Sequence, residues 1–422
     1  MKRREFLRLA LGAGAAMALG GAGAFAPGCT SRAAARSHRS GAAAERKLII
    51  VLFGGGTRSS ETIDDPQHRY IPHLWTEMAP KGTLFTNMRV EGRVVHPNSA
   101  GSVVTGHWEY EDIDWSRPVA HPTVFETYRK HRGAPDTSAW AFVYASILAN
   151  TGMSLAPGYG MEFAANVVEP PTVPRATAEE IDRLMREAAA LGSPEAELEA
   201  STRAARLARS SSRIARSGLR SPAAREFMEQ QYGAWKNSDR TTSHDAFLTG
   251  CAIACMERFA PEVLAVEYGE IDCAHYGSWS RYVEAIHRTD ELTWRLWRAA
   301  EELEDYRGRT LMLILPDHGR EVDRPGGPGF IHHSDFYTNE GADEGCRRVW
   351  MLALGPGVNS GRRVERPVPI TAVAATGLGY LGLEASTGAE GSVLGLSPRI
   401  PQMSPQRIGD VLNKQYHGPA RV

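Results

Sequence analysis

Acidic and histidine residues stand directly after an apolar segment late in the chain. Asp317 and His318 follow the apolar residues 310–315, and a histidine pair, His332 and His333, comes after a glycine- and proline-rich loop. A carboxylate oxygen and an imidazole nitrogen at a strand end can together bind a divalent metal ion. An Asp-His-Gly tripeptide alone can be a simple turn. The preceding strand and the second histidine pair make a metal site the better interpretation.

A second group of polar residues follows another apolar segment, 263–268. Glu270, Asp272 and His275 lie there within six positions. Two carboxylates and an imidazole exceed what solvation of a surface loop requires, and they suit a hard or borderline divalent ion. Cys273 could join a zinc site, although a lone thiol among carboxylates is more often a small buried side chain. This group therefore predicts further ligands for the same centre.

The third segment whose side chains could take part in a reaction is 95–109, which contains hydroxyl, amide and imidazole groups. Asn98 or Ser99 can cap a helix, whose N-terminal amides would bind an oxyanion. A hydroxyl at such a helix end, next to a metal ion, is a candidate nucleophile. For any single serine, a simple capping role is the competing interpretation. Ser99 is ranked before Ser102, which lies further into the helix.

Apolar segments without polar alternation must position these residues. They predict strands buried on both faces, and a helical pattern over 279–303 lies between two of them. We therefore expect an α/β fold, a mostly parallel central sheet with helices on both faces, within a domain spanning 47–400. In such sheets the site forms beyond the carboxyl ends of the strands. The four apolar segments are 47–53, 263–268, 310–315 and 349–354.

Residues 176–235 differ in composition and predict a helical insertion. An acidic, alanine-rich helix with a capping box at its start is followed by a second helix after Pro194. Six arginines spaced three or four apart fall on one face of that second helix. This face is either solvated and balanced by neighbouring glutamates, or it contacts an anionic surface such as lipid headgroups. The six arginines are Arg203, Arg206, Arg209, Arg213, Arg216 and Arg220.

The N-terminal segment is typical of an export signal. Arg3 and Arg4 precede Phe-Leu and a glycine-rich apolar run that ends at Cys29, and this pattern resembles a twin-arginine signal followed by a lipobox. We expect cleavage after residue 28, lipidation of Cys29, and a cell-envelope location. A plain membrane anchor is the alternative. Residues 29–46 read as a flexible tether, and 401–422 as a C-terminal tail.

The composition excludes some classes of protein. The 48 basic and 49 acidic residues give a formal charge of -1, which leaves no global basic field for nucleic acid. Five cysteines are too few and too irregularly spaced for a disulfide scaffold or a zinc ribbon. Any metal site must therefore use histidine, aspartate and glutamate.

Together these motifs resemble the alkaline phosphatase superfamily, which includes sulfatases, phosphodiesterases and phosphopentomutases. The resemblance covers most of 47–400 outside the insertion, and the glycine-rich segment 54–66 is similar to a twin-arginine-exported bacterial branch. The Asp-His-Gly context is the most specific of its motifs. The segments that carry the resemblance are Asp317-His318-Gly319, 270–275, Thr105-Gly106-His107-Trp108-Glu109, Ile71-Pro72-His73-Leu74 and 82–87.

The resemblance implies ligand roles for these residues. Asp317 and His318 would hold one ion, and Asp272 or Glu270, His275 and His332 or His333 would hold the other. Family members usually have a metal-binding aspartate where the first strand ends, but here three glycines occupy that place. Glu61 is the expected substitute, with Asp64 and Asp65 as other acids nearby.

The nucleophile also departs from the family pattern. Counting nine residues back from Thr105, as in sulfatases, reaches His96. Counting three back from Gly106, as in the mutases, reaches Val103, so neither count finds a hydroxyl. Ser99 or Ser102 serves if the helix start is shifted, and His96 could instead bind the metal or orient a water. The formylglycine signature Cys-x-Pro-Ser-Arg is absent from the sequence, which disfavours a standard sulfatase.

We therefore expect an exported metal-dependent hydrolase of phosphate or sulfate esters with one or two divalent ions. Zinc is the expected metal, with manganese or calcium as alternatives. The substrate is expected to be a small-molecule or glycan ester. The alternative is a degenerate superfamily member that binds a ligand or a surface glycan without turnover.

Overall fold

The computed structural model describes residues 46–171, 218–237, 243–273, 279–323 and 344–386, together with the single positions 186, 325 and 389. The chain divides into two units, residues 1–44 and 45–422, and every described residue lies in the second. The predicted signal, most of the tether and the predicted tail lie outside the described residues. So does most of the predicted insertion. Among the described helices, none is both long enough and apolar enough to cross a bilayer.

A single mixed sheet forms the centre of the described structure. Its order is β4-β3-β5-β1-β6-β7-β2-β8, and β9 pairs with β2. β1 pairs in parallel with both β5 and β6, whereas β7 runs antiparallel to β6 and to β2. The strands are β1 Lys47–Leu52, β2 Thr83–Arg89, β3 Ala139–Val143, β4 Asn166–Val168, β5 Val263–Glu267, β6 Thr310–Leu315, β7 Arg348–Leu354, β8 Arg362–Val364 and β9 Val368–Pro369.

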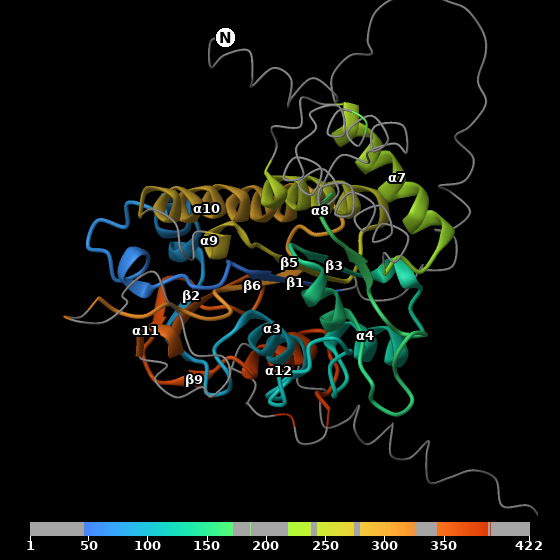
Figure 1. Cartoon of the computed structure of the whole chain (residues 1–422), viewed down its shortest axis with the longest axis horizontal. Helices are drawn as coiled ribbons and strands as arrows, with labels where there is room; N and C mark the ends of the chain where they lie inside the picture. The colour runs from blue at the N-terminus through green and yellow to red at the C-terminus, as the bar shows by residue number, and fades with distance from the viewer. Residues whose placement is uncertain are drawn as a thin grey trace, which may run out of the picture. The chain divides into compact units, whose positions relative to one another are not determined.

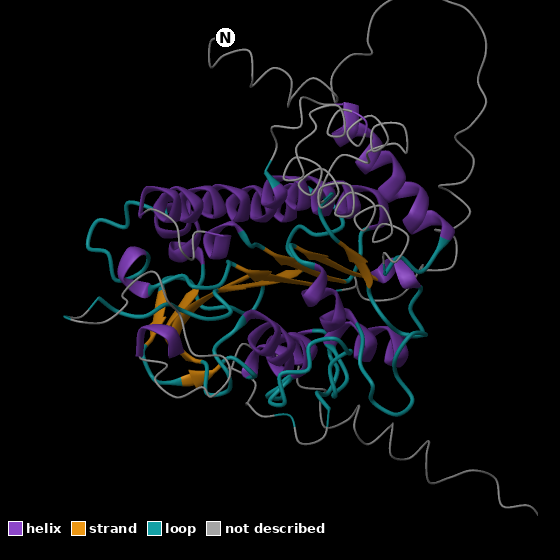
Figure 2. Cartoon of the chain, viewed as in Figure 1, coloured by secondary structure: helices purple, strands orange, loops and turns teal. Residues whose placement is uncertain are grey.

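Helices cover both faces of this sheet (Figures 1 and 2). α7, α8 and α10 pack on one face, and α3, α4 and α12 pack on the other. The short helix α9 follows β5, and the short helix α11 directly precedes β7. The helices are α3 His96–Thr105, α4 Val124–Arg132, α7 Pro222–Asn237, α8 His244–Phe259, α9 Glu270–Cys273, α10 Trp279–Glu302, α11 Glu344–Arg347 and α12 Ala372–Tyr380.

The central strand β1 shows why the sequence forms this architecture. All six of its residues are buried. Leu48 and Ile50 pack into the core on the α3 side, and Ile49 and Val51 pack into the core on the α8 and α10 side. Burying such side chains stabilises the fold by roughly 1.5–3 kcal/mol each. A strand with apolar side chains on both faces requires helices on both faces.

The prediction of a mostly parallel α/β sheet with helices on both sides is confirmed. The apolar segment 349–354 does form a strand, β7, but it enters the sheet antiparallel. Of the predicted insertion, the structure describes Arg186, which is helical, and the residues from 218 onward, which include most of α7. Arg220 there donates its backbone N–H to the Asn166 side chain, 2.8 Å away, so the last arginine of the predicted row packs beside β4.

Candidate metal centre

Three buried side chains converge at the carboxyl end of β6. Asp317 and His318 follow that strand, and His96 is the first residue of α3. One ligand atom from each lies within 4.8 Å of the other two. His96 Nδ1 is 2.7 Å from Asp317 Oδ2, and the two imidazole rings lie 4.6 Å apart. β7 runs antiparallel to both β2 and β6, so the end of β2, which precedes α3, lies at the same edge as the end of β6.

The charge states of the three side chains follow from burial and mutual contact. Burial opposes ionisation of Asp317, but His96 and His318 together hold the pKa of Asp317 below its ordinary value. Burial lowers the pKa of His318 and keeps that imidazole neutral. Burial also disfavours a charged His96, yet Tyr144, Asp317 and Asp272 raise the pKa of His96 well above its ordinary value. Burial therefore opposes charge on all three side chains, while their mutual contacts favour an ionised Asp317 and a protonated His96.

A turn of three glycines leaves room for this cluster. A Cβ atom on Gly55 would lie 2.0 Å from His96 Cε1 and 2.6 Å from His318 Nε2. The Gly56 amide nitrogen lies 3.2 Å from His318 Nδ1, and Arg320 donates to the Gly56 carbonyl oxygen over 2.8 Å. The imidazole of His96 thus occupies the space into which a side chain at the end of β1 would extend.

Asp272 joins the cluster, whereas Glu270 does not. Asp272 Oδ2 lies 3.1 Å from His96 Nε2. Glu270 instead pairs with Arg288 and accepts from the Asp245 backbone N–H at 3.3 Å. The Asp245 carboxylate accepts from the backbone N–H groups of Gly269 and Glu270, and this holds the turn that carries Asp272. Burial, reinforced by Glu270, raises the pKa of Asp245 to about 7.

Glu61 lies apart from the three-residue cluster. The Arg58 guanidinium binds both of its carboxylate oxygens, at 2.7 and 2.9 Å, and the Tyr282 hydroxyl donates to it at 3.1 Å. Both partners of this ion pair are buried. The structure thus places Glu61 in an ion pair rather than where the missing β1 aspartate was expected. Arg348 binds both carboxylate oxygens of Asp64, and the Arg69 side chain binds one oxygen of Asp65 at 3.1 Å.

The two candidate serines have different environments in α3. Ser99 is buried, and among the described residues its hydroxyl has no hydrogen-bond partner. The Ser102 hydroxyl donates to the Asn98 carbonyl oxygen at 2.6 Å and accepts from the Glu109 N–H at 3.1 Å. Ser102 therefore has a structural role, and Ser99 has a hydroxyl not used by the fold.

The helix that carries these serines, α3, begins at His96, before both residues that were expected to cap it. Val95 is the N-cap residue and makes no capping hydrogen bond, and Pro97 lies in the first turn, where proline is favourable. The Asn98 side chain donates to the carbonyl oxygens of Glu109 and Tyr110. The expectation that Asn98 or Ser99 caps the helix is wrong, because proline sets the start of α3 and Asn98 orders the following loop.

One acidic residue of the site was missed by the sequence analysis. Glu267 is the last residue of β5, is 3% exposed, and has an Oε1 without a hydrogen-bond partner among the described residues. Burial, together with the charge of Asp317, raises the pKa of Glu267 well above its ordinary value. The available signal was a single acid ending an otherwise apolar strand. His275, His332 and His333, which were predicted as ligands, lie outside the described residues.

The residues at the cluster fit a divalent ion. Two imidazoles and one carboxylate form a common three-ligand catalytic set for zinc, with one position left for water or substrate. Asp317 Oδ1 is buried and has no hydrogen-bond partner within the described part of the chain. His318 Nδ1 lies 2.9 Å from the Gly319 carbonyl oxygen, and donation to it would leave Nε2 with the lone pair that a metal requires.

Comparisons with known proteins bear on the fold. No protein-family model matches the sequence, and no curated protein does. The PsFucS1 sulfatase from Pseudoalteromonas sp. is similar in structure, with a TM-score of 0.50, 14% identity, and coverage of 80% of this chain and 68% of that chain. The phosphonate monoester hydrolase SpPMH from Silicibacter pomeroyi has a TM-score of 0.48, 14% identity, and coverage of 83% and 76%.

A protein in the alkaline phosphatase superfamily from Vibrio parahaemolyticus is also similar, with a TM-score of 0.42, 12% identity, and coverage of 83% of this chain and 70% of that one. At these identities the likeness concerns the fold. The mostly parallel sheet, the two helical layers and the Asp-His-Gly turn after β6 agree with what the resemblance in the sequence implied. The chain therefore shares its fold with the PsFucS1 sulfatase.

Proposed function

We propose that the protein is a metal-dependent hydrolase of phosphate or sulfate esters. The observation that carries this proposal is the convergence of His96, Asp317 and His318 within 4.8 Å at the carboxyl edge of the sheet. These three residues would hold a divalent ion, with zinc as the expected metal. Such an ion would polarise the ester and lower the pKa of a nearby water or hydroxyl.

The chain's own residues supply the remaining requirements. Asp317 is held ionised inside the protein by its two imidazole neighbours, and His318 is held neutral by burial, as a nitrogen ligand must be. Asp272 approaches His96 from the turn after β5. Asp272 can accept the proton that a protonated His96 must lose before its imidazole binds a metal ion. Ser99 offers a hydroxyl that the fold leaves unused.

The proposal is tested by turnover of simple aryl esters. Purified protein supplied with zinc, manganese or calcium would be assayed with p-nitrophenyl phosphate, bis-p-nitrophenyl phosphate and p-nitrophenyl sulfate. We expect turnover of at least one ester, lost in Asp317→Asn and retained in Asp112→Asn, an exposed acid in a surface ion pair. Equal rates in wild type and Asp317→Asn would contradict the proposal.

A second candidate is a binding protein without turnover. The position of His96 supports it. Its two ring nitrogens contact Asp272 and Asp317, so a protonated imidazole there can neutralise these carboxylates without a metal ion. Under this alternative no ester is turned over by metal-supplied wild type, and His96 serves the stability of the fold.

We also propose that the protein works outside the cytoplasm. Arg3 and Arg4, the apolar run and Cys29 support export by the twin-arginine route and lipid anchoring at the cell envelope. The esters it meets there would be small molecules or glycans.

A further inference from the structure

The loop that precedes β4, residues 154–163, exposes apolar side chains to solvent. Leu155 is 55% exposed and Met161 is 69% exposed, and they are two of the four large apolar side chains that the described structure leaves exposed. Tyr159 and Phe163, in the same loop, are partly exposed. Single exposed apolar residues are ordinary on a protein surface, but a group of them on one loop indicates an interaction site.

Hydrogen bonds at both ends of this loop fix its conformation. The buried Glu126 carboxylate, in α4, accepts from the Ser154 backbone N–H at 2.9 Å and from the Gly160 backbone N–H at 2.8 Å. Gly160 has a φ of 93°, in the region that favours glycine. The Arg129 guanidinium donates to the Ala164 carbonyl oxygen at 2.7 Å. The fold itself therefore presents these apolar side chains to solvent.

Basic side chains lie beside the exposed apolar ones. Lys130 Nζ, near the end of α4, lies 3.9 Å from the Tyr159 ring centroid and 6.0 Å from that of Phe163. The Arg220 guanidinium donates to the Met161 sulfur at 3.1 Å. Long basic side chains that lie along apolar groups and keep their charge in water suit a boundary between apolar and aqueous surroundings.

The start of the folded body lies beside the same end of α4. Arg46, the first residue of the described body, donates to the Tyr380 carbonyl oxygen at 2.7 Å, and Arg132 donates to the adjacent Leu381 carbonyl oxygen at 2.7 Å. Cys29 is seventeen residues before Arg46 in the sequence, a length of chain that spans at most about 60 Å. An acyl group on Cys29 would therefore hold this part of the body close to a bilayer.

These segments lie at the amino edge of the sheet. Residues 129–136 precede β3, the loop 154–163 precedes β4, and Arg46 precedes β1, and these strands run in the same direction. The candidate metal centre lies at the carboxyl end of β6, which is parallel to β1. Figure 1 shows α4 on the right, and α9 and α11, which adjoin the carboxyl edge, on the left. Contact through the amino edge would therefore leave the candidate metal centre uncovered.

The local charge of this edge favours an anionic surface. In the segments 129–136 and 154–163 the acids are Asp136 and Glu162. The basic side chains that reach solvent there are Lys130 and Arg132, and they are joined by Arg46 and Arg220 through the contacts above. The whole chain has a formal charge of -1, so the positive charge is local to this edge.

We infer that this edge of the protein docks on an anionic lipid bilayer. The docking face is the loop 154–163 together with Lys130, Arg132 and Arg220. Its apolar side chains would enter the headgroup region, where aromatic side chains are also favoured, and its basic side chains would pair with lipid phosphates. The inference goes beyond the proposed hydrolase activity. It uses the proposed cell-envelope location only to place a bilayer beside the protein.

Vesicle co-sedimentation of the mature chain, residues 29–422, tests the inference. The chain would carry Cys29→Ser so that no acyl group contributes, and the described body belongs to a unit separate from residues 1–44. The vesicles would contain phosphatidylcholine alone or an equimolar mixture with phosphatidylglycerol. We expect binding to the anionic vesicles to be about tenfold tighter or more, and to weaken in high salt, because basic side chains supply the attraction.

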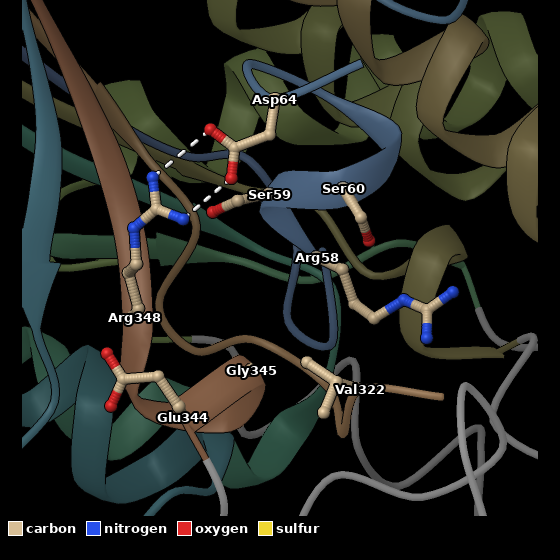
Figure 3. Close-up of a pocket in the computed structure, with 8 residues that line it drawn as sticks. All are labelled: Arg58, Ser59, Ser60, Asp64, Val322, Glu344, Gly345 and Arg348. Carbon is tan, nitrogen blue, oxygen red and sulfur yellow. Dashed lines mark hydrogen bonds and ion pairs between the residues drawn. The ribbon is translucent and has the colours of Figure 1, made fainter. Parts of the chain in front are cut away.

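Two exposed apolar positions provide variants with little risk to folding. Leu155→Ser combined with Met161→Ser should weaken binding to anionic vesicles about fivefold or more, because less apolar surface enters the bilayer. Val322→Ser is the matched control. Val322 is 43% exposed and lines a pocket beside Arg58 at the carboxyl edge (Figure 3), so this change should leave vesicle binding unaltered. Melting temperatures of all variants check that the fold is retained.

A second pair of variants tests the charge of the docking face. Lys130→Gln should weaken binding to anionic vesicles about fivefold, the effect of one basic side chain near such a surface. Arg281→Gln removes an exposed arginine at the start of α10, next to the carboxyl edge, and should leave binding unchanged.

Three results would overturn the inference. The first is equal vesicle binding by the unsubstituted docking face and both docking-face variants, and the second is equal binding to neutral and anionic vesicles. The third is a dimer that sediments without vesicles and is lost in the Leu155→Ser, Met161→Ser variant, which would assign the face to a second copy of the chain. Because the protein is unacylated and no ester is present, failure of the proposed hydrolase activity or of lipid anchoring would leave these results unaffected.

Discussion

Gly55 lies so close to His96 that a methyl group on its α-carbon would be 2.0 Å from the imidazole Cε1. The end of β1 therefore contributes backbone rather than a side chain to the candidate metal centre. His96 reaches the same space from the start of α3 and contacts Asp317 there. The imidazole from α3 therefore supplies the side chain that the glycine turn after β1 does not.

Gly55→Ala should damage the centre while Gly250→Ala should not. The added methyl at position 55 must displace His96 or the turn, at a cost of roughly 1–3 kcal/mol in the free energy of unfolding. Gly250 lies in α8, and a Cβ atom there has nothing within 4 Å, so alanine should stabilise by about 0.5–1 kcal/mol. Urea unfolding of both variants measures the difference. Equal stabilities would contradict the close packing described for Gly55.

The sequence allowed the central strands and part of the site to be predicted. β1 and β6 are unbroken apolar runs that end in turn residues, so Asp317 and His318 could be placed at a strand end. β3 was not predicted, because the strand has only five residues and its sequence resembles a helical fragment. Glu267 was not recognised, since only the sheet register shows that it shares an edge with Leu52 and Leu315.

The contacts of Glu61 illustrate what the sequence could not show. An acid near the end of β1 is a reasonable substitute ligand, but Arg58 three residues earlier binds both of its oxygens. Which of several acids faces the cluster depends on the local turn and on partners distant in sequence, such as Tyr282. Pairings of this kind cannot be derived from spacing alone.

Ser99→Ala should mainly reduce activity, whereas Ser102→Ala should mainly reduce the free energy of unfolding. Ser99 uses its hydroxyl for no hydrogen bond in the described structure, so alanine should keep the free energy of unfolding within about 0.5 kcal/mol. Activity on a turned-over ester should fall about a hundredfold or more if Ser99 is the nucleophile. Ser102→Ala loses two hydrogen bonds and should destabilise by roughly 1–3 kcal/mol with a smaller loss of activity. Full activity in Ser99→Ala would direct attention to His96 or to water.

His107 should make the fold sensitive to acid. Burial, with a smaller effect of the stacked His121, lowers the pKa of His107 from 6.5 to about 4. The unfolded chain therefore binds a proton between these values while the folded chain does not, so stability is fully present above pH 6.5 and falls as the pH approaches 4. His107→Gln should show a smaller loss of melting temperature between pH 7 and pH 5. A slope identical to that of wild type would show that other groups cause the acid sensitivity.

Export and anchoring can be separated by two variants of the N-terminal segment. Arg3→Lys combined with Arg4→Lys should leave the precursor in the cytoplasm, because the arginine pair is the feature recognised in a twin-arginine signal. Cys29→Ser should give a soluble or uncleaved form, because the acylated thiol is lost. Fractionation and mass spectrometry of the N-terminus measure both. Membrane localisation unchanged in both variants would favour a plain anchor.

Metal content is the most direct test of the central claim. Elemental analysis would be made on mature protein purified with zinc, manganese or calcium supplied, and on Asp317→Asn prepared in parallel. We predict about one equivalent or more of a divalent metal in wild type and at least about a tenfold lower affinity in the variant, because a carboxylate ligand flanked by His96 and His318 is removed. Less than about half an equivalent in wild type, or equal metal content in both proteins, would contradict the account.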